Sequence, residues 1–171
     1  MTARPGLLPL LACGALALLA SCSHYHLGTA TAGPGFDRLF VAPVVNAAYV
    51  PQAAPLVATQ VRTAFARDGR VVLADASGDS ARLDIRLVSY EHAIAAVLPS
   101  DTALGRKFNV SLTAEITVTD ASGKKLIDRR TVRVSRDVFS DSGQQPAEYQ
   151  TLPLIAEALA TEIAHAVLDT W

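Results

Sequence analysis

Residues 107–119 alternate between polar and apolar side chains without a break over 13 residues. Side chains on a β-strand point to opposite faces in turn, so this pattern predicts a strand with one buried face and one solvated face. Such one-sided burial is typical of antiparallel sheets, because crossover helices usually cover both faces of a parallel sheet. The side chains expected in the core are Phe108, Val110, Leu112, Ala114, Ile116 and Val118. A second layer must therefore cover this face.

Two segments with helical periodicity can supply that layer. Residues 51–68 carry an apolar stripe at helical spacing, and Gly69 directly after them is a suitable helix end. A second stripe runs from Ile155 to Val167, with Pro153 placed to start or kink the helix. Both segments are therefore predicted to be amphipathic helices.

The remaining strands are shorter or less regular. Pro43 favours an edge or strand-end position, and the apolar phase slips at Leu87-Val88, which predicts a β-bulge. Strands are predicted at 39–45, 71–73, 83–90, 107–119 and 124–139, with a hairpin turn at 120–123. The order strand, helix, several strands, helix predicts an α+β two-layer sandwich. In it, two helices pack on one face of a mixed, mainly antiparallel sheet of about four to five strands.

The N-terminus has the features of a bacterial lipoprotein signal. An apolar run of 14 residues, Leu7 to Ala20, follows Arg4 and is too short to span a bilayer comfortably. It ends at Leu19-Ala20-Ser21-Cys22, where small residues precede a cysteine as in a lipobox. The alternative is an ordinary cleavage site beside an incidental cysteine. We expect residues 1–21 to be removed as a signal peptide and Cys22 to be the lipid attachment site.

These expectations define the organisation of the mature chain. Residues 22–36 form a lipidated tether rich in Gly, Thr and Ala, and residues 37–171 form a single α+β domain. Ser23 follows the cysteine where an Asp would favour retention in the inner membrane. We therefore expect the protein to be anchored by its acyl chains to the periplasmic leaflet of the outer membrane.

The residue inventory argues against an enzyme. The sequence contains no Gly-rich phosphate loop, no HExxH motif and no GxSxG motif. His24 and His26 lie in the tether without a third ligand, so neither a metal site nor another cofactor is expected. A formal net charge of −1 argues against non-specific nucleic-acid binding. Binding of a lipid or a protein is the remaining class of function.

Charge is distributed unevenly along the chain. Residues 104–136 contain eight basic and three acidic side chains, for a net charge of +5, whereas 137–171 contain six acids and no Lys or Arg. Arg binds phosphate bidentately, so a basic strand face suits an anionic amphiphile or a phosphorylated sugar. We take Lys107, Arg129 and Arg133 as candidate contacts for such a ligand. The alternative is a solvated face that uses Lys and Arg to block edge pairing.

The segment 93–99 is apolar where a strand should end in a loop. Val97 and Leu98 at its tip are candidate contacts for a partner or a lipid. The same side chains could instead fold back on the core, and the sequence alone does not separate these two interpretations.

Several short motifs occur together in a recognisable order. The lipobox is followed by Tyr25-His26-Leu27-Gly28, then by Val41-Ala42-Pro43-Val44-Val45-Asn46, and then by Pro51 before the first helix. With the hairpin turn at 120–124 and a closing helix from Leu152 to Trp171, this order resembles the LptE-type lipopolysaccharide-assembly lipoproteins. The resemblance extends over essentially the whole mature chain.

The resemblance implies a non-enzymatic role in the outer membrane. Proteins of this type are partner and plug of a large β-barrel of the LptD type, and they assist delivery of lipopolysaccharide to the cell surface. The expected partners are therefore that barrel, lipopolysaccharide, and the membrane through the N-terminal lipid. The alternative from the residues alone is a generic periplasmic envelope-assembly scaffold or a peptidoglycan-synthase-activating lipoprotein.

Overall fold

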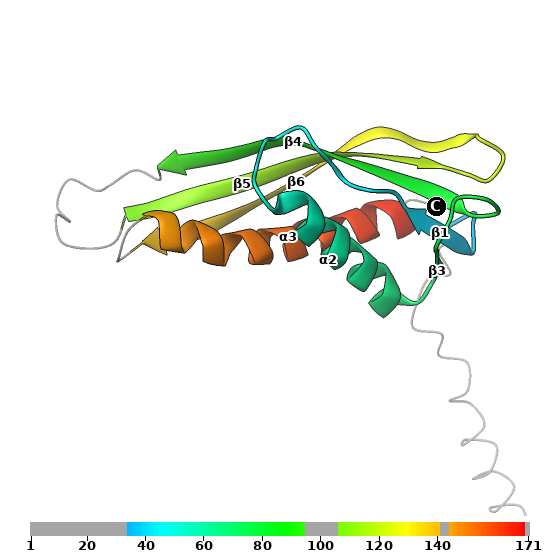
Figure 1. Cartoon of the computed structure of the whole chain (residues 1–171), viewed down its shortest axis with the longest axis horizontal. Helices are drawn as coiled ribbons and strands as arrows, with labels where there is room; N and C mark the ends of the chain where they lie inside the picture. Colours follow the sequence, from blue (N-terminus) through cyan, green and yellow to red (C-terminus); the bar gives the residue numbers. More distant parts are fainter. Residues whose placement is uncertain (1–33, 95–105, 141–143, 170–171) are drawn as a thin grey trace, which may run out of the picture. The chain divides into compact units, whose positions relative to one another are not determined.

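Three long neighbouring strands form most of the sheet in the computed structural model, which describes residues 34–94, 106–140 and 144–169 (Figure 1). They are β4 (Ala81–Ile94), β5 (Arg106–Thr119) and β6 (Lys125–Ser140). β5 pairs antiparallel with β4 and with β6, which confirms the antiparallel arrangement predicted from its alternation. The hairpin turn is stabilised by Asp120 Oδ1, which accepts hydrogen bonds from the backbone N–H groups of Ser122 and Lys124.

Three short strands complete one side of the sheet. They are β1 (Arg38–Val41), β2 (Val45–Asn46) and β3 (Val72–Ala74). The strand order is β3-β1-β4-β5-β6; β1 is parallel to both of its neighbours, and β2 pairs parallel with β4. The sheet thus has six strands rather than four to five. Pro43 explains the extra one, because it lies between β1 and β2 and has no N–H to continue the ladder.

Both helices pack on one face of this sheet, as predicted (Figure 1). α2 (Ala53–Asp68) buries Ala53, Val57, Val61 and Phe65, and it ends at Gly69, whose φ of 75° is left-handed. The Gly69 N–H donates to the carbonyl oxygen of Phe65 and closes the last turn.

α3 (Gln144–Leu168) is longer than its apolar stripe predicted. The helix expected from Leu152 begins eight residues earlier, so Pro153 lies inside it rather than at its start. A proline inside a helix removes one hydrogen bond, and the buried side chains that follow can offset that loss by packing. Ile155, Leu159 and Ile163 are fully buried.

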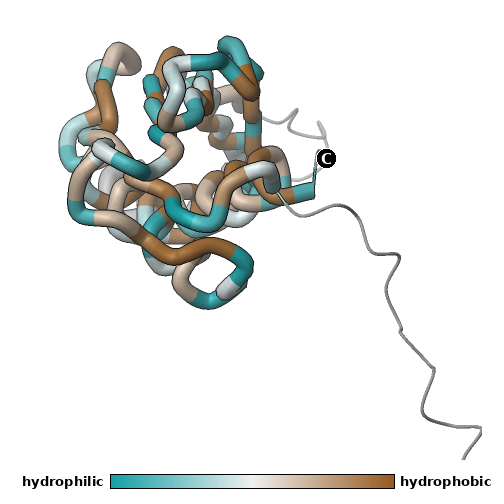
Figure 2. Tube along the Cα trace, turned by 90° about the vertical axis from the view of Figure 1, so that its right-hand side faces the viewer, coloured by the Kyte–Doolittle hydropathy of each residue, from teal (hydrophilic) through white to brown (hydrophobic). Residues whose placement is uncertain are grey.

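The core lies between the helices and the sheet. Leu83, Ile85 and Leu87 of β4 meet Leu112 and Ile116 of β5 there. Figure 2 shows hydrophobic and hydrophilic residues interleaved along the same segments, as one-sided burial requires. The stretch Gln150–Leu168 is long and apolar enough to cross a membrane, but most of it is buried within the fold, as in a core helix.

Candidate functional site

The face of β4, β5 and β6 opposite the helices, here called the polar face, contains the candidate site. The predicted bulge is confirmed by a register shift between Leu87 and Ser89. Because of this shift, the odd-numbered residues of β4 lie on the core face before it and on the polar face after it. Beyond the shift, Ser89 lies opposite Thr113 of β5, and Thr113 lies opposite Arg133 of β6. Ser89, Thr113 and Arg133 therefore form one row of polar side chains across the three strands, here called the polar row.

The Arg133 side chain reaches from this row to the next pair along the strands, Glu91 and Ser111. Its Nη2 donates to Glu91 Oε2 of β4 at 3.0 Å and to Ser111 Oγ of β5 at 3.0 Å. The Arg133 side chain therefore crosses β5 and joins the two outer strands. The Arg133 and Glu91 side chains are 56% and 55% exposed, so the ion pair they form remains open to solvent.

Two hydroxyl side chains lie at the level of this crossing. Ser111 is 3% exposed and Thr113 is 7% exposed, although both belong to the solvated side of the alternation pattern. Thr113 Oγ1 is buried and has no hydrogen-bond partner among the described residues. The polar face therefore contains one buried hydroxyl whose bonding capacity is unused.

Arg129 is placed by a second irregularity, in β6. Asp128 and Arg129 lie between the paired positions Ile127 and Arg130, and the φ of Arg129 is 46°. The Arg129 N–H donates to Thr117 Oγ1 at 3.3 Å, and its guanidinium Nε lies 4.0 Å from Asp128. Its side chain is 78% exposed and therefore accessible to a ligand.

Other candidate residues lie partly or wholly outside the described structure. Lys107 is paired with Phe139 through the backbone of β5, but its side chain is not among those described. Cys22, Val97 and Leu98 lie outside the described residues.

Several cations of the basic segment have internal partners. Arg130 Nη1 donates to the carbonyl oxygen of Ala166 at 3.2 Å, and Arg136 Nη1 donates to that of Leu154 at 3.4 Å. The hydrogen bond from Lys125 lowers the pKa of Asp128. Some of the basic side chains in this segment therefore bind to α3 or to a neighbour within β6.

The sequence interpretation missed Glu91 and the two buried hydroxyls. Glu91 lies outside the basic segment 104–136, and only the pairing of β5 with both β4 and β6 brings it next to Arg133. The phase slip at Leu87-Val88 was the one available signal, because it changes which β4 side chains share the face of Ser111.

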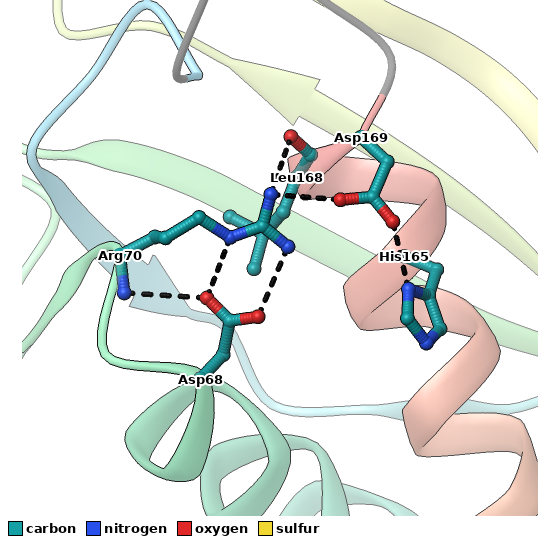
Figure 3. A network of polar contacts seen from close by, with 5 residues as sticks. All are labelled: Asp68, Arg70, His165, Leu168 and Asp169. Carbon is teal, nitrogen blue, oxygen red and sulfur yellow. Dashed lines mark hydrogen bonds and ion pairs between the residues drawn. The ribbon is translucent and has the colours of Figure 1, made fainter. Parts of the chain in front are cut away.

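A second polar network joins the ends of the two helices (Figure 3). Arg70 binds both carboxylate oxygens of Asp68, at 2.7 and 3.0 Å, and its Nη1 lies 2.7 Å from Asp169 Oδ1. The hydrogen bond with Arg70 lowers the pKa of Asp68. Hydrogen bonds with His165 and then Arg70 lower the pKa of Asp169. This network connects the two helices and lies apart from the polar row.

Comparison with known proteins identifies relatives of this fold. The family model described as LptE, Lipopolysaccharide-assembly, matches residues 36–168. No curated protein matches the chain.

Solved structures share its architecture. A minor lipoprotein from Acinetobacter baumannii has a TM-score of 0.52 and 16% identity, over 77% of this chain and 91% of that chain. A hypothetical protein from Chlamydia trachomatis has a TM-score of 0.53 and 10% identity, over 76% and 94%. A Xanthomonas campestris protein has a TM-score of 0.52 and 15% identity, over 74% and 81%. At these identities the likeness shows the fold alone.

Proposed function

The chain belongs to the LptE lipopolysaccharide-assembly family, and we propose that it is the lipid-anchored partner and plug of an outer-membrane β-barrel of the LptD type. The family match over residues 36–168 carries this proposal. In this role the protein assists transport of lipopolysaccharide to the cell surface by binding, without catalysing a reaction. Family membership makes it a lipoprotein of the assembly machinery in the cell envelope.

The polar face is the proposed contact for lipopolysaccharide. This glycolipid carries phosphate groups, which guanidinium groups recognise through charge-assisted hydrogen bonds. Arg129 and Arg133 have largely exposed side chains on β6, and the basic segment also contains Lys107. These three residues are the proposed lipopolysaccharide contacts.

Anchoring is proposed to occur through Cys22. Several acyl chains on one cysteine would hold the protein in the outer membrane without a transmembrane helix. Cys22→Ser should release it from membranes when the barrel is not expressed. Retention of the variant in the outer membrane under that condition would contradict the anchoring proposal.

Val97 and Leu98 are proposed to contact the barrel. An apolar loop tip can act as an anchor within a contact that is otherwise polar, as expected inside a barrel lumen. The apolar composition of segment 93–98 supports this assignment.

Affinity purification of the intact lipoprotein from outer membranes tests the proposed function. We expect a one-to-one complex with a β-barrel that survives detergent extraction. Recovery of a peptidoglycan synthase instead would support the alternative of a synthase-activating lipoprotein. If no barrel is recovered, the proposed partnership is wrong.

A further inference from the structure

Thr113 has a buried hydroxyl that the fold does not use. It lies in the polar row between Ser89 and Arg133, only 7% exposed, and its Oγ1 has no partner within the described structure. Proteins leave few buried polar groups unpaired, because each one loses its bonds to water. A hydroxyl kept in this position therefore suggests a bonding partner supplied from outside the chain.

The neighbouring contacts show what kind of partner fits. The Arg133 guanidinium already binds one anion, the carboxylate of Glu91, while also donating to Ser111 Oγ. A hydroxyl that accepts one hydrogen bond still has a proton to donate, so Ser111 keeps a donor for a ligand. Arg133, Ser111 and Thr113 thus place a guanidinium and two hydroxyls on neighbouring positions of the polar face, and each is a potential donor to an anionic group.

The bond between Arg133 and Glu91 can be exchanged. Both side chains are more than half exposed, and ion pairs of this kind contribute little net stability. A phosphate group carries up to two negative charges and three acceptor oxygens, so it competes for Arg133 better than a single carboxylate does.

We infer that Arg133, Ser111 and Thr113 form a phosphate-binding subsite, and that Glu91 occupies its anion position until a phosphate group displaces it. This inference rests on the proposed function, since the phosphate would be that of a glycolipid. It adds a regulatory element, because only an anion that binds Arg133 more tightly than the Glu91 carboxylate does can displace Glu91.

The same face provides a matched control. Arg82 pairs with Asp84 at 2.7 Å, and both side chains are 44% exposed, much like the Arg133–Glu91 pair. The three hydrogen bonds of this pair join the Arg82 guanidinium to the Asp84 carboxylate, and none involves a buried hydroxyl. Asp84→Asn therefore frees an arginine on the polar face without opening the proposed subsite.

The test measures binding of bisphosphorylated lipid A and of dephosphorylated lipid A to the full-length protein in detergent. Glu91→Gln should tighten binding of the phosphorylated form about 2–5-fold, the range expected for losing a competing surface ion pair. Asp84→Asn should leave the affinity unchanged, and Arg133→Gln and Thr113→Val should weaken it. Tighter binding by Glu91→Gln cannot arise from a folding defect.

Two results would overturn the subsite. One is that the Glu91→Gln and Asp84→Asn variants bind phosphorylated lipid A with the same affinity. The other is an equal gain for the dephosphorylated form. Either result alongside normal recovery of the barrel would remove the subsite and leave the proposed function standing.

Inorganic phosphate as competitor identifies the source of the anion. Competition at millimolar concentration supports a site for the phosphate group itself. Selective binding of phosphorylated lipid A without such competition supports a site that recognises phosphate only on the glycolipid.

Discussion

Arg70 joins the ends of both helices, since its Nη1 lies 2.7 Å from Asp169 Oδ1 while its Nε lies 2.7 Å from Asp68 Oδ1. Nη1 also donates to the carbonyl oxygen of Leu168 at 3.3 Å, at the end of α3 (Figure 3). One side chain thus connects the last residue of α2, Asp68, with the last residue of α3, Leu168, and with Asp169 directly after it.

Arg70→Ala should destabilise the fold modestly. The loss of two partly exposed ion pairs is expected to lower Tm by roughly 2–4 °C, because solvent screens such pairs. Arg82→Ala, which breaks a pair within a single strand, should lower it less. Thermal unfolding by circular dichroism measures both, and added salt should shrink the Arg70 effect. An equal loss in both variants would show that Arg70 does not connect the helices energetically.

Acid should abolish the contribution of this network. The pKa of Asp68 and that of Asp169 are both lowered from 3.8 in the folded protein. Groups with depressed pKa values stabilise the fold above the pKa of the unfolded chain, about 4, and lose that effect as the pH falls through the folded value. The stability difference between wild type and Arg70→Ala should therefore persist at pH 6 and shrink steadily as the pH falls below about 4, through the lowered pKa values of the two carboxyl groups. Urea titrations at a series of pH values measure it. A difference that grows in acid would contradict this assignment.

Thr113→Val should stabilise the protein while weakening binding of phosphorylated lipid. Valine keeps the shape of threonine and removes an unpaired buried hydroxyl, so the free energy of unfolding should rise by about 1 kcal/mol. Ser111→Ala is the control: it removes an acceptor of Arg133 and should lower that free energy by about 0.5–1.5 kcal/mol. Denaturant unfolding measures both. A destabilised Thr113→Val would mean that the hydroxyl already has a partner.

Gly69→Ala should destabilise the end of α2. The φ of Gly69 is 75°, and a side chain in this left-handed region costs about 1–2 kcal/mol even though no atom obstructs a Cβ there. Gly78→Ala also meets no atom within 4 Å, and Gly78 has no such φ, so this control should change stability by less than about 0.5 kcal/mol. Equal effects in the two variants would contradict the conformational argument.

Changing Val97 and Leu98 together to Asp should reduce recovery of the barrel complex. If the loop contacts the barrel, charges there remove an apolar anchor while the melting temperature of the isolated protein stays nearly unchanged. Co-purification and thermal unfolding of the same preparation measure both quantities. Unfolding of the variant would instead place the loop in the core.

Local patterns in the sequence determined the elements of this fold. The alternation of residues 107–119 predicted an antiparallel strand with one buried face, and Gly69 marked the end of α2. The phase slip at Leu87-Val88 predicted the bulge. These features depend on neighbours within a few residues, so periodicity and turn chemistry are sufficient to find them.

Only the tertiary structure decided which side chains meet across the sheet. Alternation tells which face a residue is on, whereas strand register tells what lies beside it, and register depends on pairing between distant segments. Glu91 and Arg133 are 42 residues apart, and β4, β5 and β6 must pair before they touch. The burial of Thr113 likewise depends on its neighbours on other strands, since its own place in the alternation predicted a solvated side chain.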